Sequence, residues 1–168
     1  MNDPMRILKT DHREVERLLT KLADSDEGDE RQTLMQEVVM KLTAHMDMEE
    51  QLLYPMVAER VGAEDEEEAQ IEHGLAREGI EKMSGMAEMP GFGAVVEMLK
   101  GGILHHVEEE ETEIMPELKD ALTTDEWRAL GDAFAQAKEA AGLPVPAPPR
   151  RRSTKRRSRS SASRNGRK

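Results

Sequence analysis

The chain has 168 residues, of which 37% are hydrophobic and 35% charged, while aromatic residues make up only 2%. This length predicts one domain of ordinary size. The scarcity of aromatic residues and the 12 methionines predict a core of aliphatic and methionine side chains. The absence of cysteine excludes disulfides, thiolate zinc sites, iron–sulfur clusters and cysteine nucleophiles. Any metal site must therefore use imidazole and oxygen ligands.

The net charge of -11 combines an acidic body with a basic C-terminal tail. Residues 150–168 contain ten of the 24 Lys and Arg and no Asp or Glu, so residues 1–149 hold 24 − 10 = 14 basic against 35 acidic residues, a net charge of -21. No apolar run approaches the length of about eighteen residues that a membrane span needs. The N-terminal segment lacks a signal-peptide pattern, and we expect a cytoplasmic protein.

Five segments show helical periodicity. The first begins at Pro4, a favoured first helical position, and the second extends from about residue 30 to residue 61. The third covers about 64–86 and the fourth about 92–121, and a capping box at 123–126 opens a short fifth helix. The expected buried stripes are Leu8, His12, Val15, Leu19 and Leu22; Val38, Leu42, His45, Glu49 and Leu52; Ala69, His73, Ala76, Ile80 and Met83; and Leu99, Ile103, His106, Glu110 and Ile114.

These segments predict an all-α protein, because strand-like alternation is absent from the sequence. Four long helices joined by short loops indicate an antiparallel up-down-up-down four-helix bundle, to which the short C-terminal helix is added. We assign residues 1–142 to this domain. Residues 143–168 form a Pro-rich spacer and an Arg/Ser/Lys-rich tail, and we expect this tail to be disordered.

The two halves of the chain repeat at a separation of 61 residues. The segment HMDMEEQLLYP, starting at His45, corresponds to HVEEEETEIMP, starting at His106. The same shift takes the Asp-His pair at 11–12 onto the Glu-His pair at 72–73. It therefore pairs His12 with His73, His45 with His106, Glu49 with Glu110 and Glu50 with Glu111.

The four paired histidines and the first pair of glutamates all fall on the apolar stripes, so a bundle would direct them into one interior. Histidines satisfied by ordinary core contacts, with the glutamates at the rim, are the alternative. Two buried carboxylates without partners would cost several kcal/mol each, and the duplicated spacing favours a metal centre. Six donors exceed the four that zinc usually takes, whereas two octahedral ions offer about twelve positions. We predict a two-metal site with about two positions open to a small ligand.

The pattern His12, His45-x-x-x-Glu49, His73 and His106-x-x-x-Glu110 resembles the hemerythrin-like (HHE cation-binding) family. The resemblance covers about residues 5–120, and EEQLLYP matches the family's usual ending of the second helix. It implies a non-heme centre of two iron ions, bridged by oxide or hydroxide, with these six residues as metal ligands. It also implies a role in binding, sensing or transforming O2, peroxide or NO.

Two departures from oxygen-carrying hemerythrins bear on activity. Those carriers have a further histidine one turn after the third-helix ligand, where this chain has Arg77, and they commonly have an aspartate in place of Glu110. One iron would then have fewer protein ligands, which favours redox chemistry with peroxide or O2 over reversible transport. Tyr54 is expected to pack in the core, with a phenolate ligand as the alternative.

Three neighbours of the predicted ligands are assigned less definite places. His105 points about 100° away from His106 on an ideal helix, and we expect it to be exposed or to lie behind a ligand. Asp11 and Glu72 are expected at the surface, with orientation of a ligand as the alternative.

Two functional interpretations stay open. One is a di-iron redox protein for oxidative stress, including an enzyme that decomposes peroxide. The other is a non-catalytic metal or gas sensor, or an iron-binding module, whose basic tail contacts nucleic acid or another anionic partner. The tail has no aromatic residues, so contacts with nucleic acid would go to phosphates without base specificity. A solvated appendage, or a tail folded back on the acidic body, is equally compatible with its composition.

Overall fold

The computed structural model describes residues 2–147, and all regular structure in this range is helical. The elements are α1 (Pro4–Ala23), α2 (Asp29–Met48), η1 (Glu49–Leu53), α3 (Tyr54–Arg60), α4 (Ala63–Gly85), α5 (Phe92–Glu109), η2 (Glu110–Ile114), α6 (Met115–Ala121) and α7 (Thr124–Ala140). α2, η1 and α3 follow one another without a loop, as do α5, η2 and α6. The predicted basic tail lies outside the described residues.

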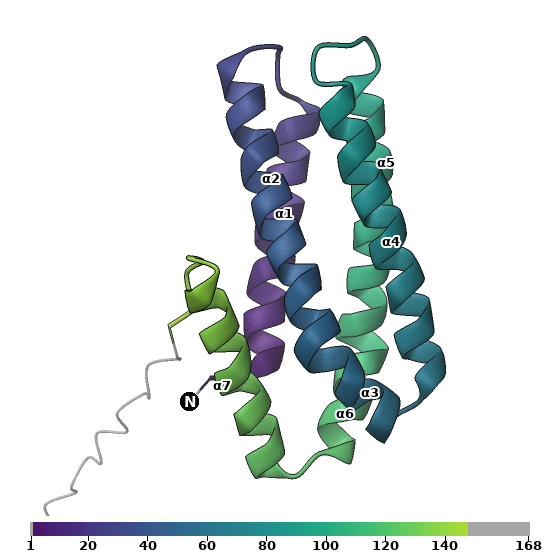
Figure 1. Ribbon diagram of the computed structural model, residues 1–168, viewed down its shortest axis with the longest axis vertical. Helices are drawn as coiled ribbons and strands as arrows, with labels where there is room; N and C mark the ends of the chain where they lie inside the picture. The colour runs from purple at the N-terminus through teal and green to yellow at the C-terminus, as the bar shows by residue number, and fades with distance from the viewer. Residues whose placement is uncertain (1, 148–168) are drawn as a thin grey trace, which may run out of the picture.

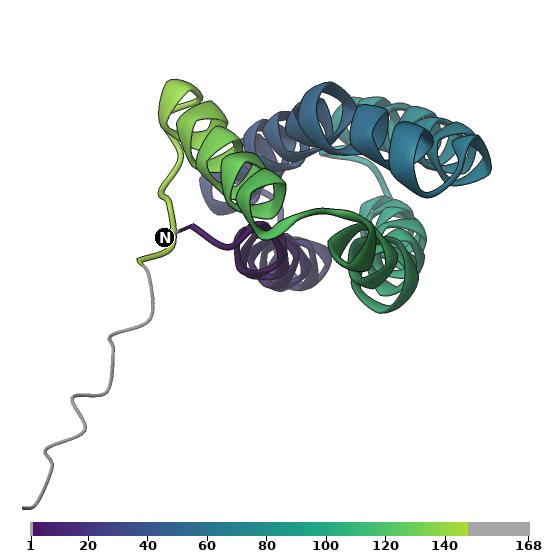
Figure 2. The same cartoon turned by 90° about the horizontal axis from the view of Figure 1, so that it is seen from below.

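The long helices form an antiparallel bundle, as Figure 1 shows. The α1–α2 and α4–α5 loops lie at one end, and the chain turns from α3 into α4 and from α6 into α7 at the other (Figure 1). α7 packs against α1, α2 and η1 beside that second end, which the view from below shows clearly (Figure 2). The predicted fold class, a four-helix bundle with a short additional helix, is confirmed. No described helix is long and apolar enough to cross a membrane.

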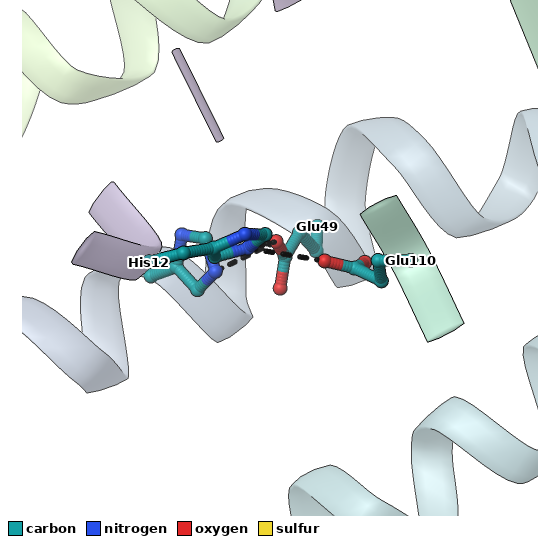
Figure 3. Close-up of side chains that lie close together, drawn as sticks. His12, Glu49 and Glu110 are labelled. Carbon is teal, nitrogen blue, oxygen red and sulfur yellow. Dashed lines mark ion pairs between the residues drawn. The ribbon is translucent and has the colours of Figure 1, made fainter. Parts of the chain in front are cut away.

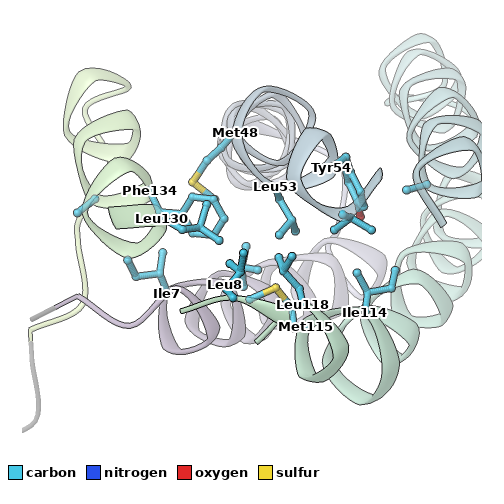
Figure 4. Packing of buried hydrophobic residues seen from close by; sticks show 14 residues of the cluster. Ile7, Leu8, Met48, Leu53, Tyr54, Ile114, Met115, Leu118, Leu130 and Phe134 are labelled. Carbon is cyan, nitrogen blue, oxygen red and sulfur yellow. The ribbon is translucent and has the colours of Figure 1, made fainter. Parts of the chain in front are cut away.

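Two apolar clusters fill the bundle, one above the other. The cluster beside α7 contains Leu8, Leu53 and Phe134, and Figure 4 shows these side chains meeting between α1, α2–α3 and α7. The other cluster contains Val15 and Leu42 and extends toward the loop end. Along α1, His12 lies between the residues that enter the two clusters. The predicted polar residues thus occupy a layer between two apolar cores.

Two short π-helical turns interrupt the long helices at equivalent positions of the repeat. In each, the backbone N–H bonds five residues back, from Tyr54 to Glu49 and from Met115 to Glu110. A proline follows each donor and supplies no N–H, so the ordinary four-residue bonding cannot continue through it. The extra residue rotates the helix beyond it, so that Leu53 and Tyr54 are buried while Leu52, predicted to be buried, is only partly so.

Candidate metal centre

The structure brings together all six residues that the sequence predicts as metal ligands. Each of the four antiparallel helices contributes one histidine, and the two glutamates are the first residues of η1 and η2. All six side chains are buried, and the glutamates are 0% exposed. Two sets have donor atoms within 4.8 Å of one another: His12, His45, Glu49 and Glu110, and Glu49, His73 and His106. Figure 3 shows His12, Glu49 and Glu110 converging from three elements.

The glutamates lie between the two histidine pairs. Glu49 places Oε1 2.8 Å from His45 Nε2 and Oε2 3.5 Å from His73 Nε2. Glu110 places Oε2 3.2 Å from His12 Nε2 and Oε1 3.8 Å from His106 Nε2. Each carboxylate therefore turns one oxygen toward the α1–α2 pair and the other toward the α4–α5 pair. Two cations, one beside each pair of imidazoles, could share both carboxylates in this arrangement.

The outer ring nitrogens of the histidines face a second set of carboxylates. Nδ1 of His12 lies 2.9 Å from Glu111, Nδ1 of His73 2.9 Å from Glu50, Nδ1 of His106 2.7 Å from Glu72, and Nδ1 of His45 3.8 Å from Asp11. An ionised carboxylate only accepts hydrogen bonds, so the three close contacts fix the proton on Nδ1 and leave Nε2 to face the interior. The alternative role of orienting a ligand, left open for Asp11 and Glu72, fits these positions.

This outer set obeys the same repeat, since Asp11 and Glu72 are equivalent, as are Glu50 and Glu111. The repeat pairs these residues in the sequence but does not assign a contact to Glu50 or Glu111. Each of the latter two supports a histidine of the opposite half of the chain. Sequence spacing alone does not show such a contact, because it crosses between helices distant in the chain.

Arg77 occupies the position at which oxygen-carrying hemerythrins have an additional histidine. Its guanidinium donates hydrogen bonds to Glu50 at 2.7 Å and to Asp47 at 2.9 Å. It therefore holds the carboxylate behind His73 and does not point toward the six donors. Lys9 and Lys138 have similar roles, since Lys9 lies 3.1 Å from Glu111 and Lys138 lies 2.5 Å from Asp11.

Tyr54 reaches the candidate site because of the π-helical turn that precedes it. It belongs to the core cluster, as expected, but its hydroxyl also donates to Glu110 at 2.5 Å and lies 3.3 Å from His106 Nε2. Burial raises the pKa of Tyr54, and the nearby Glu110 and Glu49 raise it further. His105, in contrast, is exposed, with Nε2 3.8 Å from Glu72.

Several buried donor atoms have no hydrogen-bond partner among the described residues. Among the six predicted ligands they are His12 Nε2, both carboxylate oxygens of Glu49 and Glu110 Oε2 on the inner side, and His45 Nδ1 on the outer side. His12 Nε2 lies 3.2 Å from Glu110 Oε2 and 4.0 Å from Glu49 Oε1 without hydrogen-bond geometry, so these atoms converge on shared space. Such groups are costly to bury unless a cation or another partner satisfies them. The donors present, imidazole nitrogens and carboxylate oxygens, fit iron and other first-row transition metals.

In the protein without metal, the close approach of buried histidines and glutamates determines which of them are protonated. Burial alone would lower the pKa of His12, but Glu110 and Glu49 outweigh it and raise the pKa to about 10. The pKa of His45 is raised to about 9, because Glu49 and Asp11 outweigh its burial. Burial acts to raise the pKa of Glu49, yet His45, His12 and His73 hold it well below its ordinary value. Protons on imidazoles thus neutralise the carboxylates, and a metal would displace these protons.

A four-helix bundle with duplicated histidines and glutamates in its interior defines a class of cation-binding helical proteins. Residues 3–118 match the model of the hemerythrin HHE cation binding domain. The chain therefore belongs to the hemerythrin HHE cation-binding family, as its sequence motif predicted. α7 lies beyond the matched residues.

Two curated relatives are similar over most of this chain. A DNA nickase of Nostoc sp. is 26% identical over 133 residues, which are 79% of this chain and 38% of the relative. An uncharacterized hemerythrin-like protein of Schizosaccharomyces pombe is 26% identical over 133 residues, 77% of this chain and 66% of the relative. The chain thus covers less than two thirds of either relative's length. No solved structure matches it.

Proposed function

We propose that this protein binds two iron ions through His12, His45, Glu49, His73, His106 and Glu110, and that it uses them to react with peroxide or O2. The observation that supports the proposal best is the placement of the two buried glutamates. Each turns one oxygen to each pair of histidines, so each can bridge two cations. Two imidazoles and two carboxylates would hold each ion, fewer than the six donors that an octahedral iron takes, so that a small ligand could also be bound.

The iron ions would exchange electrons with peroxide, O2 or NO. The residues of the chain would hold these ions and adjust their reactivity. The carboxylates behind Nδ1 fix the direction of the imidazoles. Tyr54 can donate its hydroxyl proton in a hydrogen bond beside His106, because burial and neighbouring carboxylates keep it protonated. Arg77 provides a guanidinium where carriers have a further ligand, which favours reaction over reversible transport. The proposal includes the cytoplasmic location predicted from the sequence.

The first test is metal content and peroxide consumption of the full chain purified in air. We expect about two irons per chain and catalytic loss of peroxide. His106→Ala should lose iron and peroxide consumption, whereas His105→Ala, the matched control on the adjacent exposed residue, should keep both. Negligible iron after iron supplementation, or equal effects of the two substitutions, would refute the proposal.

A second candidate is a sensor that contacts nucleic acid without turnover. It is supported by the ten basic residues at 150–168 and by the similarity to a DNA nickase. The similarity covers only 38% of that relative, so its activity is not transferred to this chain. Binding of the full chain to DNA should weaken linearly on a log–log plot against salt, and a chain ending at residue 147 should bind far more weakly. Dependence of this binding on iron or peroxide, without peroxide loss, would favour the sensor.

A further inference from the structure

An apolar cavity of about 610 Å³ extends from the candidate metal centre along α4 and α5. His73 and His106 line it at the metal centre, and Lys82 lines it farther along α4. Lys82 follows His73 by nine residues, which is about 14 Å along an α-helix. The volume lies within the range of small-molecule sites and far exceeds what peroxide, O2 or NO would need.

The wall of this cavity consists mainly of aliphatic and small side chains. They are Leu75, Ala76 and Gly79 from α4, and Met98, Leu99 and Gly102 from α5. Leu75 is 61% exposed and Met98 80% exposed, so two large apolar side chains stand at the opening of the cavity. An apolar ligand there would remove both from water, which is favourable in proportion to the area covered.

Gly102 keeps part of this space open at a cost to the helix. Gly101 and Gly102 are consecutive in the middle of α5, where each glycine is less favourable than alanine by about 1 kcal/mol. A Cβ at Gly102 would meet no atom within 4 Å, so close packing against another element does not explain it. Gly102 shares a helical face with Met98 and His105, and all three line the cavity, whereas Gly101 does not.

Charge gives the cavity two different ends. Lys82 is an exposed residue with no ion-pair partner within 4.0 Å among residues 2–147, and it lines the cavity at the end remote from the histidines. Glu72 lines the opposite end, beside His106. An anionic group is therefore favoured at Lys82 and disfavoured near Glu72, so that the apolar part of a ligand would lie toward the metal centre.

We propose that this cavity binds an anionic amphiphile, a medium-chain fatty acid or a closely similar molecule, with its carboxylate at Lys82 and its alkyl chain directed to the histidines. The inference rests on the proposed function for its relation to the metal centre, since the chain would end beside the two iron positions. It extends that function by making an apolar organic molecule, and not only a small oxidant, a ligand of the site.

The test is displacement of a dansyl-labelled undecanoate from the full chain by dodecanoate, followed by fluorescence. Gly102→Leu places a side chain in the cavity and should weaken binding about tenfold or more, a loss typical of a filled site. Gly101→Leu is the matched control, because it makes the same change in the adjacent residue and should leave binding unchanged. Both substitutions remove a helix glycine, so both variants should fold, which circular dichroism checks.

Lys82→Gln tests the head group. It should weaken dodecanoate by about two- to fivefold, as expected for an exposed ion pair, and leave the neutral dodecanol unaffected. The proposal would be overturned if the Gly101→Leu and Gly102→Leu variants bound dodecanoate equally well. It would also be overturned if dodecanoate, up to its solubility limit, did not displace the dansyl-labelled undecanoate. Binding requires no turnover, so a protein that binds dodecanoate but has no peroxide activity would refute the proposed function and leave this inference standing.

Discussion

Lys138→Met removes the cation that joins α7 to the outer part of the candidate metal centre. Lys138 is 5% exposed, and its ammonium donates to both carboxylate oxygens of Asp11, at 2.5 and 2.6 Å. Asp11 in turn lies 3.8 Å from His45 Nδ1. Methionine keeps much of the aliphatic stem but leaves Asp11 without its lysine partner, in a position where its side chain is only 16% exposed.

The expected loss of stability follows from this burial. Removing one partner of a fully buried ion pair costs about 3–5 kcal/mol, and the partial exposure of Asp11 reduces the expectation to about 2–3 kcal/mol. For a domain of this size, that corresponds to a fall in melting temperature of about 7–10 °C. Urea unfolding should show a lower midpoint with an unchanged slope, because the folded and unfolded surfaces stay nearly the same.

A double-mutant cycle with Asp11→Asn separates the ion pair from the packing of the lysine stem. If the pair accounts for the loss, the double variant should be more stable than the sum of the single losses predicts, by about 1–3 kcal/mol. Lys82→Met is the control, since Lys82 is exposed and has no carboxylate within 4.0 Å among residues 2–147, and the change should stay within about 0.5 kcal/mol. A Lys138→Met variant whose free energy of unfolding lies within about 0.5 kcal/mol of that of the original protein would refute the reasoning.

Four further predictions concern proton release, the pH dependence of stability, the tyrosine and α7. Metal binding at pH 7.5 should release about two protons, from His12 and His45, because their pKa values of about 10 and 9 keep them charged without metal. Titration calorimetry in two buffers measures the number of protons released, and no release would contradict the prediction. The same raised pKa values stabilise the metal-free protein fully below about pH 6.5, and this contribution is lost as the pH rises through 9 to 10. Tyr54→Phe removes the donor to Glu110 and should cost the metal-free protein about 1.5–3 kcal/mol in urea unfolding, so an unchanged midpoint would exclude that bond as a stabiliser. Phe134→Ala leaves a cavity between α7 and the bundle and should cost about 3–5 kcal/mol, and a smaller loss would show that α7 docks by other contacts.

The bundle and the meeting of the six donors could be predicted because both follow from spacing. Leu8, His12 and Val15 advance at helical intervals, and the 61-residue repeat shows that polar residues on such a stripe are not accidental. The family motif added the identity of the expected cation. A core position filled by histidine in one helix alone would not have supported the same prediction.

The position of Tyr54 could not be predicted from the same spacing. An ideal helix places it away from His45, and Pro55 indicates only that the hydrogen bonding must change. Whether the chain kinks or inserts a π-helical turn depends on packing around Glu49 and Leu53, which single-sequence periodicity does not contain. Lys138 was missed for another reason, because its partner Asp11 is far away in the chain and α7 lies outside the repeat.

The outer carboxylates give the two halves of the site different electrostatic surroundings. Three have a cationic partner, since Asp11 contacts Lys138, Glu50 contacts Arg77 and Glu111 contacts Lys9. Glu72 has no Lys or Arg within 4.0 Å in residues 2–147, and it lines an acidic groove with Glu109 and other carboxylates.

The Nδ1 of His106 therefore lies 2.7 Å from a carboxylate whose charge is balanced by no lysine or arginine of residues 2–147. A hydrogen bond to such a carboxylate makes the imidazole a stronger electron donor through Nε2. If the six residues hold iron as proposed, the ion beside His106 and Tyr54 would have its oxidised state stabilised more than the ion beside His12 and His45. The two ligand sets would then be similar because of the repeat. The two metal positions would still differ chemically, because Lys138, Arg77 and Lys9 balance three of the outer carboxylates but not Glu72.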